Sequence, residues 1–474
     1  MAKTSSAEKP VSKNHPLFDQ AFMLHRQGKV AEATECYRQL LREKPDEMSA
    51  WLNLGTIMRQ AENFESALAC AHRAMELSPG NPSCMTNYGN CLVDLDREEE
   101  ALAMHAEAVK IKPGDVRLHT NYAIALRDFN RFEEALKQFD IACSLAPENT
   151  NIAWDRAITY LHLCDFKRGW EAFEIRWKHK DLPERKFTVP RWKGEDLKGK
   201  TILVHEEQGF GDTILCTRYL PRVVARGGRV IFECKKPLHR LFSAIPGIAK
   251  IAEPHQCGED FDYHVPMMSL PGIFETDLSN IPPVAPMFIP DAPPAAAKKL
   301  LDVHKDRFRV GIVWSGSPTF SRNRKRAVGI ERFLPFADIP GVQLYGLQKG
   351  HGQKELAEAG GDPLIIDLGP HVNDFADTAA VVRELDLVLM TDSSVAHLAS
   401  SIGKPVWNLL CYFPYWLYLH EREDSPWYPA MRLLRQPASG DWDSLFKRAR
   451  VELEKAVALK KAGKWPAVIK DKKA

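Results

Sequence analysis

The sequence lacks three features that would assign it to a broad class: a charge excess of one sign, a long apolar run, and cysteine pairs at metal-binding spacing. Its 474 residues carry 64 Lys and Arg against 62 Asp and Glu, so the chain as a whole has no field that would draw it onto nucleic acid or anionic lipid. The ten cysteines form no Cys-x-x-Cys pair, which favours small buried side chains in a reducing compartment over disulfides or metal ligands. No apolar stretch is long enough to span a bilayer, and the N-terminus has no secretory-type apolar segment. These absences predict a cytoplasmic protein without a metal site, with residues 1–13 disordered.

A repeat of 34 residues runs through the first third of the chain, and this is the tetratricopeptide period. It is marked by alanines at 33, 67, 101 and 135 and by prolines at 45, 79, 113 and 147. The alanines allow two helices to approach closely, and each proline ends a second helix. The pattern predicts four helical pairs over residues 14–149. A degenerate fifth pair and a linker follow over 150–198, with Gly169 in place of the alanine and no closing proline, as is typical of a capping repeat.

One polar position recurs within the array, as Asn53, Asn87 and Asn121. In this type of repeat the position faces the concave groove, where amide side chains can pair with the backbone of an extended peptide without reading its sequence. Asparagine is also tolerated on any exposed helix face. Its recurrence in three consecutive repeats favours an acceptor-binding groove.

From about residue 199 the pattern changes to short apolar runs separated by helical segments, which predicts parallel sheets covered by helices. The expected strands are 201–205, 229–234, 262–265, 309–314, 342–347, 364–367, 386–390 and 405–409. The proline-rich stretch 281–297 is expected to be irregular and to separate two such units. The predicted parts are a first subdomain over 199–290, a linker over 291–304, a second subdomain over 305–436, and a C-terminal helix with a basic tail over 437–474.

The loop "EEQGFGD" follows the first of these strands and ends in Asp212. Gly209 and Gly211 allow the backbone to pass close to a ligand, but the third glycine of a dinucleotide fingerprint and the Lys-Ser/Thr of a P-loop are both absent. A redox cofactor and ATP hydrolysis are therefore not expected. Asp212 is either a working carboxylate or the N-cap of the next helix.

A second loop, "TDSSVAH", follows the strand at 386–390. Asp392, Ser393 and Ser394 can cap a short helix, whose free N–H groups would suit a diphosphate. His397 is either a further ligand contact or a histidine satisfied at the helix surface. The basic residues Arg322, Arg324, Lys325 and Arg326 follow the strand at 309–314, where they are either solvated or directed at phosphate. Two aromatic segments, 411–420 and 422–429, are expected to be mostly packing, with one or two rings available to stack on a base or sugar. The acidic pairs in "DFD" (260–262) and "DWD" (441–443) are interpreted as strand-edge and helix-cap residues.

The second half resembles the family nine glycosyltransferases, the group related to ADP-heptose:lipopolysaccharide heptosyltransferases, which have the two-domain GT-B fold. The matching stretches are "QGFGDTI", "VGIVWSGSP", "LQKG", "DFADTAA", "DLVLMTDSSVAHLASSIGKPVW" and "REDSPWYP". With the repeats, the chain resembles bacterial tetratricopeptide-repeat glycosyltransferases over nearly its whole length. Its domain order is also similar to that of O-linked N-acetylglucosamine transferase.

The resemblance implies that Asp212 is the general base, that Asp392, Ser393, Ser394 and His397 border the diphosphate of the donor, and that Lys325, with Arg326 beside it, neutralises the leaving group. The implied activity is an inverting, metal-independent transfer from a nucleotide diphosphate sugar, which is a substrate and not a cofactor, to a Ser or Thr hydroxyl of a protein. The partner would be that acceptor, with flagellin as one candidate. The first subdomain is shorter than in true heptosyltransferases, which argues against a lipopolysaccharide acceptor. The alternatives are a non-catalytic scaffold on a GT-B remnant and a transferase directed at a glycan or lipid.

Overall fold

The computed structural model describes residues 15–178, 185–317, 323–361 and 363–466. The segment 1–13, Arg322 and the last part of the basic tail lie outside the described residues. The chain divides into two compact units, 1–153 and 154–474. Within the described ranges, no helix is both long enough and apolar enough to cross a membrane.

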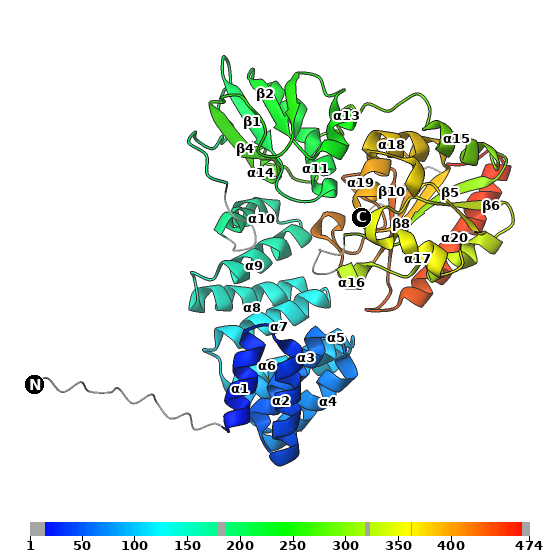
Figure 1. Ribbon diagram of the computed structural model, residues 1–474. Coiled ribbons are helices and arrows are strands. Elements are labelled where there is room, and N and C mark those ends of the chain that lie inside the picture. The colour runs from blue at the N-terminus through cyan, green and yellow to red at the C-terminus, as the bar shows by residue number, and fades with distance from the viewer. Residues whose placement is uncertain (1–14, 179–184, 318–322, 362, 467–474) are drawn as a thin grey trace, which may run out of the picture. The chain divides into compact units, whose positions relative to one another are not determined.

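The first unit is an array of antiparallel helical pairs, blue to cyan in Figure 1. Its helices are α1 (Pro16–Arg26), α2 (Val30–Glu43), α3 (Met48–Gln60), α4 (Phe64–Leu77), α5 (Pro82–Asp94), α6 (Glu98–Ile111), α7 (Val116–Asp128) and α8 (Phe132–Leu145). A fifth pair follows, α9 (Thr150–His162) and α10 (Phe166–Phe173). The four predicted pairs are confirmed.

The turn inside each pair repeats in geometry as well as in sequence. The residue that reverses the chain has a left-handed backbone at Gly28, Glu62, Asp96, Asn130 and Cys164, which are spaced 34 residues apart, with φ between 57° and 76°. A left-handed residue closes the C-terminus of a helix by letting the next N–H groups bond back to its last carbonyls. The fifth pair is therefore built like the other four, although its sequence departs from theirs.

A side-chain hydrogen bond also recurs between repeats. Trp51 Nε1 donates to the carbonyl of Pro45 at 2.8 Å, and two repeats later His119 Nε2 lies 2.8 Å from the carbonyl of Pro113. A carbonyl only accepts, so His119 must carry its proton on Nε2. Pro45 and Pro113 thus follow the end of one helix and also bind the next through their carbonyls.

Tyr37 provides a stability prediction in the first unit. It is fully buried, and its hydroxyl has no hydrogen-bond partner among the described residues. The equivalent residue three repeats later is Phe139, also fully buried. A buried hydroxyl without a partner is destabilising, so Tyr37→Phe is expected to raise the free energy of unfolding by about 1 kcal/mol. Chemical denaturation of both proteins measures the change, and a decrease would mean that the hydroxyl has a partner.

The second unit contains two fully parallel sheets. The first has the order β3-β2-β1-β4, and the second has the order β10-β9-β8-β5-β6-β7. The strands are β1 (Thr201–His205), β2 (Arg229–Glu233), β3 (Ile248–Ala252), β4 (Tyr263–Pro266), β5 (Phe308–Val313), β6 (Val342–Gly346), β7 (Ile365–Asp367), β8 (Leu387–Thr391), β9 (Val406–Leu410) and β10 (Met431–Arg435). All eight predicted strands are confirmed within one or two residues. β3 and β10 were not predicted.

Helices cover the sheets. They are α11 (Phe210–Cys216), α12 (Leu220–Val224), α13 (His239–Phe242), α14 (Leu270–Ile273), α15 (Ala295–Asp302), α16 (Asn323–Arg326), α17 (Glu355–Glu358), α18 (Phe375–Glu384), α19 (Ser394–Ser401) and α20 (Trp442–Lys461). α15 begins inside the stretch 281–297, so the expectation that all of this stretch is irregular is wrong for its last three residues, which are alanines without a proline among them.

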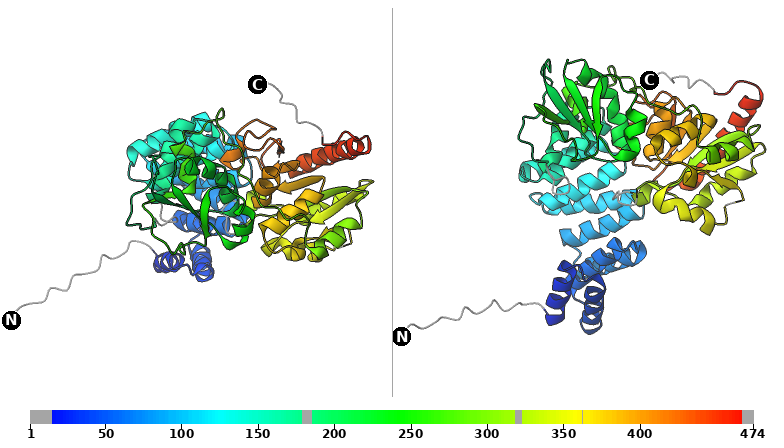
Figure 2. Two further views of the ribbon diagram at one scale, coloured as in Figure 1. Left: turned by 90° about the horizontal axis from the view of Figure 1, so that it is seen from above. Right: turned by 45° about the horizontal axis from the view of Figure 1, so that its top comes forward.

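The six-stranded sheet buries both of its faces. Val388 and Met390 of β8 share one apolar cluster with α18 and α19, and Leu387 and Leu389 share another with α20. The alternation follows from the two-residue period of a strand. α20, red in both views of Figure 2, is 20 residues long and begins at the cap Asp441, which accepts from the Ser444 N–H at 2.9 Å. The cap interpretation of "DWD" is thereby confirmed.

The fifth helical pair belongs to the second unit for most of its length, because the boundary between the units falls inside α9. Trp170 of α10 donates from Nε1 to the carbonyl of Thr276 at 2.7 Å, and its ring meets that of Trp416 edge to face at 5.3 Å. Trp170 and Phe173 lie in the same apolar cluster as β1 and β8. The predicted capping pair is thus also part of the core around the sheets.

Candidate functional site

The strand order of the second sheet indicates where a ligand would bind. Counted from its own first strand, the order is that of doubly wound dinucleotide-binding sheets, and the direction of winding reverses between β5 and β8. In such sheets ligands lie beyond the carboxyl ends of the strands at this switch point. The residues there are Trp314 and Ser315 after β5, and Asp392 and Ser393 after β8.

Asp392 is the centre of the polar contacts at this point. It is 8% exposed, and its Oδ1 accepts from the Tyr418 hydroxyl at 2.6 Å. Its Oδ2 lies 3.4 Å from Arg326 Nη1, and the Arg326 guanidinium fills the space beside Gly316. The structure thus brings two of the predicted donor-binding residues, Asp392 and Arg326, into contact. Lys325 lies next to Arg326 in α16.

α19 starts directly after this carboxylate. Ser393 is its N-cap residue, so one of the three predicted capping residues is confirmed by position, although the Ser393 side chain makes no cap hydrogen bond. Asp392 is instead bound to Tyr418 and Arg326. The first N–H groups of an α-helix have no partner within the helix, and its N-terminus has a partial positive charge.

His397 lies one turn into α19 and is buried, at 4% exposed. Its Nδ1 is 3.0 Å from the Tyr428 hydroxyl. Burial lowers the pKa of His397 to about 4, and Arg218 and Arg326 act in the same direction against Asp392. The imidazole is therefore neutral at pH 7. His397 is thus satisfied by a hydrogen bond, as one of the two interpretations has it, but it is buried and not at the helix surface. Its contact with a ligand stays a prediction.

Asp212 lies on α11, the helix that follows β1 of the first sheet. α11 begins at Phe210, so Asp212 is its third residue and not its N-cap. Asp212 Oδ2 accepts from the Gly209 N–H at 3.1 Å, and Oδ1 accepts from the Tyr415 hydroxyl at 2.9 Å. Burial raises the pKa of Asp212, with smaller contributions from Asp392 and Glu207, while the two hydrogen bonds oppose the rise. A partly exposed carboxylate with a raised pKa suits general base chemistry.

Gly211 explains how the two loops come together. A Cβ on this residue would lie 2.9 Å from His397 Cδ2 and 3.1 Å from Nε2, and 3.6 Å from the Ser394 Cα. Only glycine permits this approach of α11 to α19. The loops "EEQGFGD" and "TDSSVAH" are thus adjacent. Beside Gly209, a Cβ would meet only Asp212 Oδ2, at 3.3 Å.

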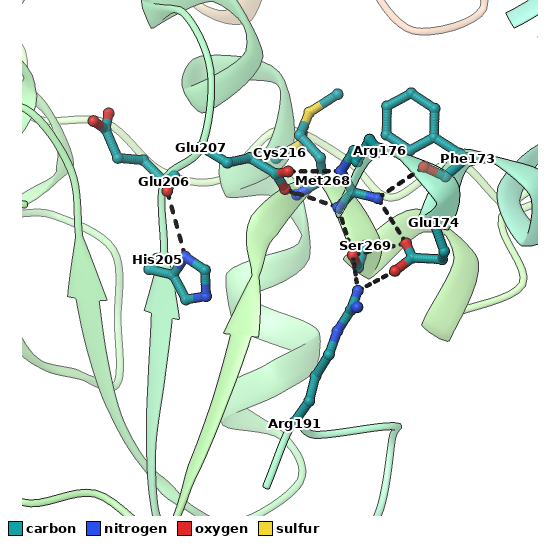
Figure 3. A network of polar contacts seen from close by, with 10 residues as sticks. All are labelled: Phe173, Glu174, Arg176, Arg191, His205, Glu206, Glu207, Cys216, Met268 and Ser269. Atoms are coloured by element: carbon teal, nitrogen blue, oxygen red, sulfur yellow. Dashed lines mark hydrogen bonds and ion pairs between the residues drawn. The ribbon is translucent and has the colours of Figure 1, made fainter. Parts of the chain in front are cut away.

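A buried ion-pair network binds Glu207 of the loop "EEQGFGD" (Figure 3). Arg176, fully buried in the 3-10 helix η1 (Glu174–Lys178), donates from Nε and Nη2 to both oxygens of Glu207, at 2.7 and 3.0 Å. Glu207 Oε1 also accepts from the Met268 N–H at 2.8 Å after β4. Burial opposes ionisation of Glu174, but Arg176 and Arg191 outweigh it and lower its pKa. The network links the end of the fifth helical pair to the carboxyl ends of β1 and β4.

Sequence reasoning missed the tyrosines and buried arginines of this site. Tyr415, Tyr418 and Tyr428 come from segments interpreted mainly as packing, yet their hydroxyls contact Asp212, Asp392 and His397. Arg218 is 2% exposed and donates to backbone carbonyls, among them that of Trp427 at 3.1 Å. The only signal of the tyrosines is that polar-tipped rings cluster between β9 and β10. The "DFD" interpretation is confirmed, since Asp262 Oδ2 accepts from the Thr201 N–H at 2.8 Å. Among the described residues, no group of three or more His, Cys, Asp or Glu side chains could hold a metal ion.

The buried histidines predict acid sensitivity of the second unit. Burial lowers the pKa of His205 to about 3 and that of His264 and His397 to about 4. Unfolded histidine takes up a proton near pH 6.5, so stability is complete above that pH and is lost as the pH falls towards 4. The melting temperature of the second unit should therefore fall across this window, and it should fall less in His205→Gln. Equal slopes for the two proteins would contradict the prediction.

The predicted groove asparagines lie in the first unit, on α3, α5 and α7. Asn53 Nδ2 donates to the Ser49 carbonyl at 3.0 Å, and Asn87 Nδ2 donates to the Ser83 carbonyl at 2.8 Å. These bonds to their own helices fix the two amides in equivalent orientations. Each of these two amides has its Oδ1 and a second N–H left for a ligand.

Comparison with known proteins identifies the first unit. The family described as the tetratricopeptide domain of cytochrome c-type biogenesis protein H matches residues 21–154. Solved tetratricopeptide structures with similarity include YrrB, described as having an unusual peptide-binding site (19% identity, 35% of this chain, 86% of that chain, TM-score 0.29). MamA of Desulfovibrio magneticus is 16% identical, over 35% of this chain and 96% of that chain, with a TM-score of 0.32. A thermophilic protein of Thermus thermophilus is 16% identical, over 35% of this chain and 91% of that chain, with a TM-score of 0.32. These low TM-scores add nothing to the assignment, which rests on the family match and the repeat geometry.

One curated relative extends beyond the array. Protein FlbA of Caulobacter vibrioides is 26% identical over 328 residues, which cover 63% of this chain and 54% of FlbA. The first unit has only 153 of the 474 residues, so the similarity reaches into the second unit. The chain spans about half the length of this relative. The sequence, the structure and the family match together define a tetratricopeptide-repeat protein with a second unit of parallel α/β sheets.

Proposed function

We propose that the protein is a glycosyltransferase of the GT-B type, related to the family nine enzymes, which transfers a sugar from a nucleotide diphosphate sugar to a protein hydroxyl. The observation that carries the proposal is the placement of Asp212. Its carboxylate has a raised pKa and lies on the helix that packs, at Gly211, against His397 and the start of α19. A base next to an anion site at the switch point of the second sheet is what such a transfer needs.

The proposed step uses residues on both loops. Asp212 takes the proton of the acceptor hydroxyl as its oxygen forms a bond to the anomeric carbon of the donor. The bond from that carbon to the phosphate oxygen breaks, and the nucleotide diphosphate leaves with the electron pair. The N–H groups at the start of α19, together with Arg326 and Lys325, stabilise this anion. The attack comes from the side opposite the leaving group, so the transfer inverts the configuration at the anomeric carbon. The cations of Arg326 and Lys325 neutralise the diphosphate, a role that a metal ion has in other transferases.

The acceptor would bind in the tetratricopeptide array. The fixed amides of Asn53 and Asn87 leave a donor and an acceptor free, and they recur with Asn121 at the repeat spacing. Such a ladder suits the backbone of an extended chain. A protein with long flexible segments, of which flagellin is an example, fits this chemistry.

A nucleotide-sugar panel read by thermal shift tests the activity. A ligand at a hundred times its Kd stabilises the folded state by about 2.7 kcal/mol, so one member of the panel should raise the melting temperature by several degrees. Arg326→Ala should abolish that shift, because it removes the cation that pairs with Asp392 and that the proposal places beside the diphosphate. If no nucleotide sugar changes the melting temperature, the result would favour the alternative, a non-catalytic scaffold.

The asparagine ladder makes a separate prediction about the acceptor. Replacing Asn53, Asn87 and Asn121 with alanine should weaken acceptor binding at least ten-fold, since each lost amide removes hydrogen bonds of about 0.5–1.5 kcal/mol. The donor-induced thermal shift should not change. Binding is measured by calorimetry with an unfolded peptide acceptor. Undiminished transfer by the triple variant would favour a glycan or lipid acceptor.

A further inference from the structure

One segment supplies a hydroxyl to each of the two carboxylates at the site. Residues 411–420, which include the 3-10 helix η9 (Trp416–Tyr418), follow β9 of the second sheet. Tyr415 donates to Asp212 Oδ1 at 2.9 Å, and Tyr418 donates to Asp392 Oδ1 at 2.6 Å. Asp212 follows β1 of the first sheet, and Asp392 follows β8 of the second. The segment therefore links carboxylates that belong to different sheets.

The segment is held between these tyrosines by Trp416 and after them by a turn. Trp416 is 1% exposed and meets Trp170 and Trp427 edge to face, at 5.3 and 6.0 Å. After η9, Leu419 has a left-handed backbone with φ 54°, which is unfavourable for leucine. Arg435 holds this turn by donating to the carbonyls of Tyr418 and Arg422. A turn that persists at this cost is fixed by its surroundings, so the position of the Tyr415 hydroxyl is fixed too.

The effect on Asp212 follows from its full set of contacts. Each carboxylate oxygen accepts one hydrogen bond, from Gly209 and from Tyr415, so the plane of the carboxylate cannot rotate without breaking both. A hydrogen bond donated to a carboxylate favours its ionised form. The charged and titratable groups facing it otherwise are Asp392, Glu207, Cys216 and the neutral His397. Of these, the two carboxylates disfavour ionisation.

We propose that Tyr415 is a positioning residue, which orients the Asp212 carboxylate and keeps it ionised for proton transfer. Its effect on catalysis rests on the proposed function, whereas its effect on the Asp212 carboxylate does not. The orientation and ionisation of the general base thus depend on a residue that follows a strand of the other sheet. An acceptor hydroxyl would meet a working base only while the segment 411–420 is in place.

Tyr415→Phe tests this because it keeps the ring and removes only the hydroxyl. The variant should lower kcat/KM about ten-fold on the acidic side of the pH profile, since it removes one charge-assisted hydrogen bond. The loss should become smaller at higher pH as Asp212 ionises, and KM for the donor should not change. Tyr345→Phe is the control, because Tyr345 is fully buried and its hydroxyl has no partner within the described ranges, so this change removes a hydroxyl without removing a hydrogen bond. A loss that is the same at every pH would overturn the proposal.

A direct titration separates this proposal from the proposed activity. Protein labelled with ¹³C at the aspartate carboxyl carbons gives an Asp212 signal that is identified by its absence in Asp212→Asn. Its titration midpoint should lie at a higher pH in Tyr415→Phe than in the wild type, and it should be unchanged in Tyr345→Phe. This shift is expected whether or not any nucleotide sugar is turned over. A midpoint that stays in place or moves to lower pH would refute the role of Tyr415 while leaving the transferase proposal intact.

Discussion

Replacing Asp212 with asparagine is expected to lower the rate of sugar transfer by about 10²- to 10⁴-fold, the usual contribution of a general base. The amide has nearly the same size and can still accept a hydrogen bond through its oxygen, so α11 should remain folded. The donor-induced thermal shift should also remain, because the proposed diphosphate contacts lie on α19 and α16. Transfer is measured as the intact mass of a co-expressed acceptor and as initial rates with purified protein.

The matched control for this variant is Asp441→Asn. Asp441 is also an aspartate that accepts a backbone N–H at the start of a helix, in α20, and it has no part in the site. It should keep the full transfer rate. If Asp212→Asn also kept it, Asp212 would be a structural residue of α11, and the base would have to be sought elsewhere.

The second large effect is expected at Arg176. Arg176→Leu leaves Glu207 buried without its cation and also removes the bonds to Ser269 and Glu174. Removing one partner of a buried ion pair costs about 3–5 kcal/mol, so the unfolding transition of the second unit should shift strongly to lower temperature. Differential scanning calorimetry measures the shift.

Two further variants identify the cause of this loss. Arg176→Leu combined with Glu207→Leu should recover part of the stability, since no unpaired charge is then buried. Arg73→Leu breaks the exposed pair with Glu76 and should change stability by less than about 1 kcal/mol. If the double variant had a lower free energy of unfolding than Arg176→Leu, the unpaired charge of Glu207 would not be the cause of the loss.

The fold was predictable where the sequence has a strong period or a continuous apolar run. The 34-residue repeat predicted α1 to α8, and buried strands such as β5 and β8 appear as apolar runs because both of their faces are covered. β3 was missed because only Ala252 of its five residues is buried. β10 was missed because arginines at 432 and 435 alternate with its buried side chains, as in a solvated helix. Edge strands of this kind resemble polar segments in the sequence.

The site was predictable only in part. Asp212 and His397 could be paired in advance, because both follow strands and the carboxyl ends of parallel strands gather ligands. The bond between Tyr415 and Asp212 joins residues 203 positions apart, and no local pattern specifies it. A tyrosine in an aromatic segment looks the same in the sequence whether its hydroxyl is exposed or bound to a carboxylate. Arg176 and Glu207 were missed for the same reason, since a buried ion pair looks like two surface charges.

The fifth helical pair determines where the molecule can be divided. Because Trp170 and Phe173 belong to the core around the sheets, excision after α10 would remove part of that core and leave an aggregation-prone remnant. Of the residues that the structure describes in the four preceding pairs, none belongs to that cluster. A chimera that exchanges these pairs ahead of Thr150 would therefore keep the core around the sheets whole, provided that the new repeats pack against Ile152 of α9, which is buried with α5 to α8.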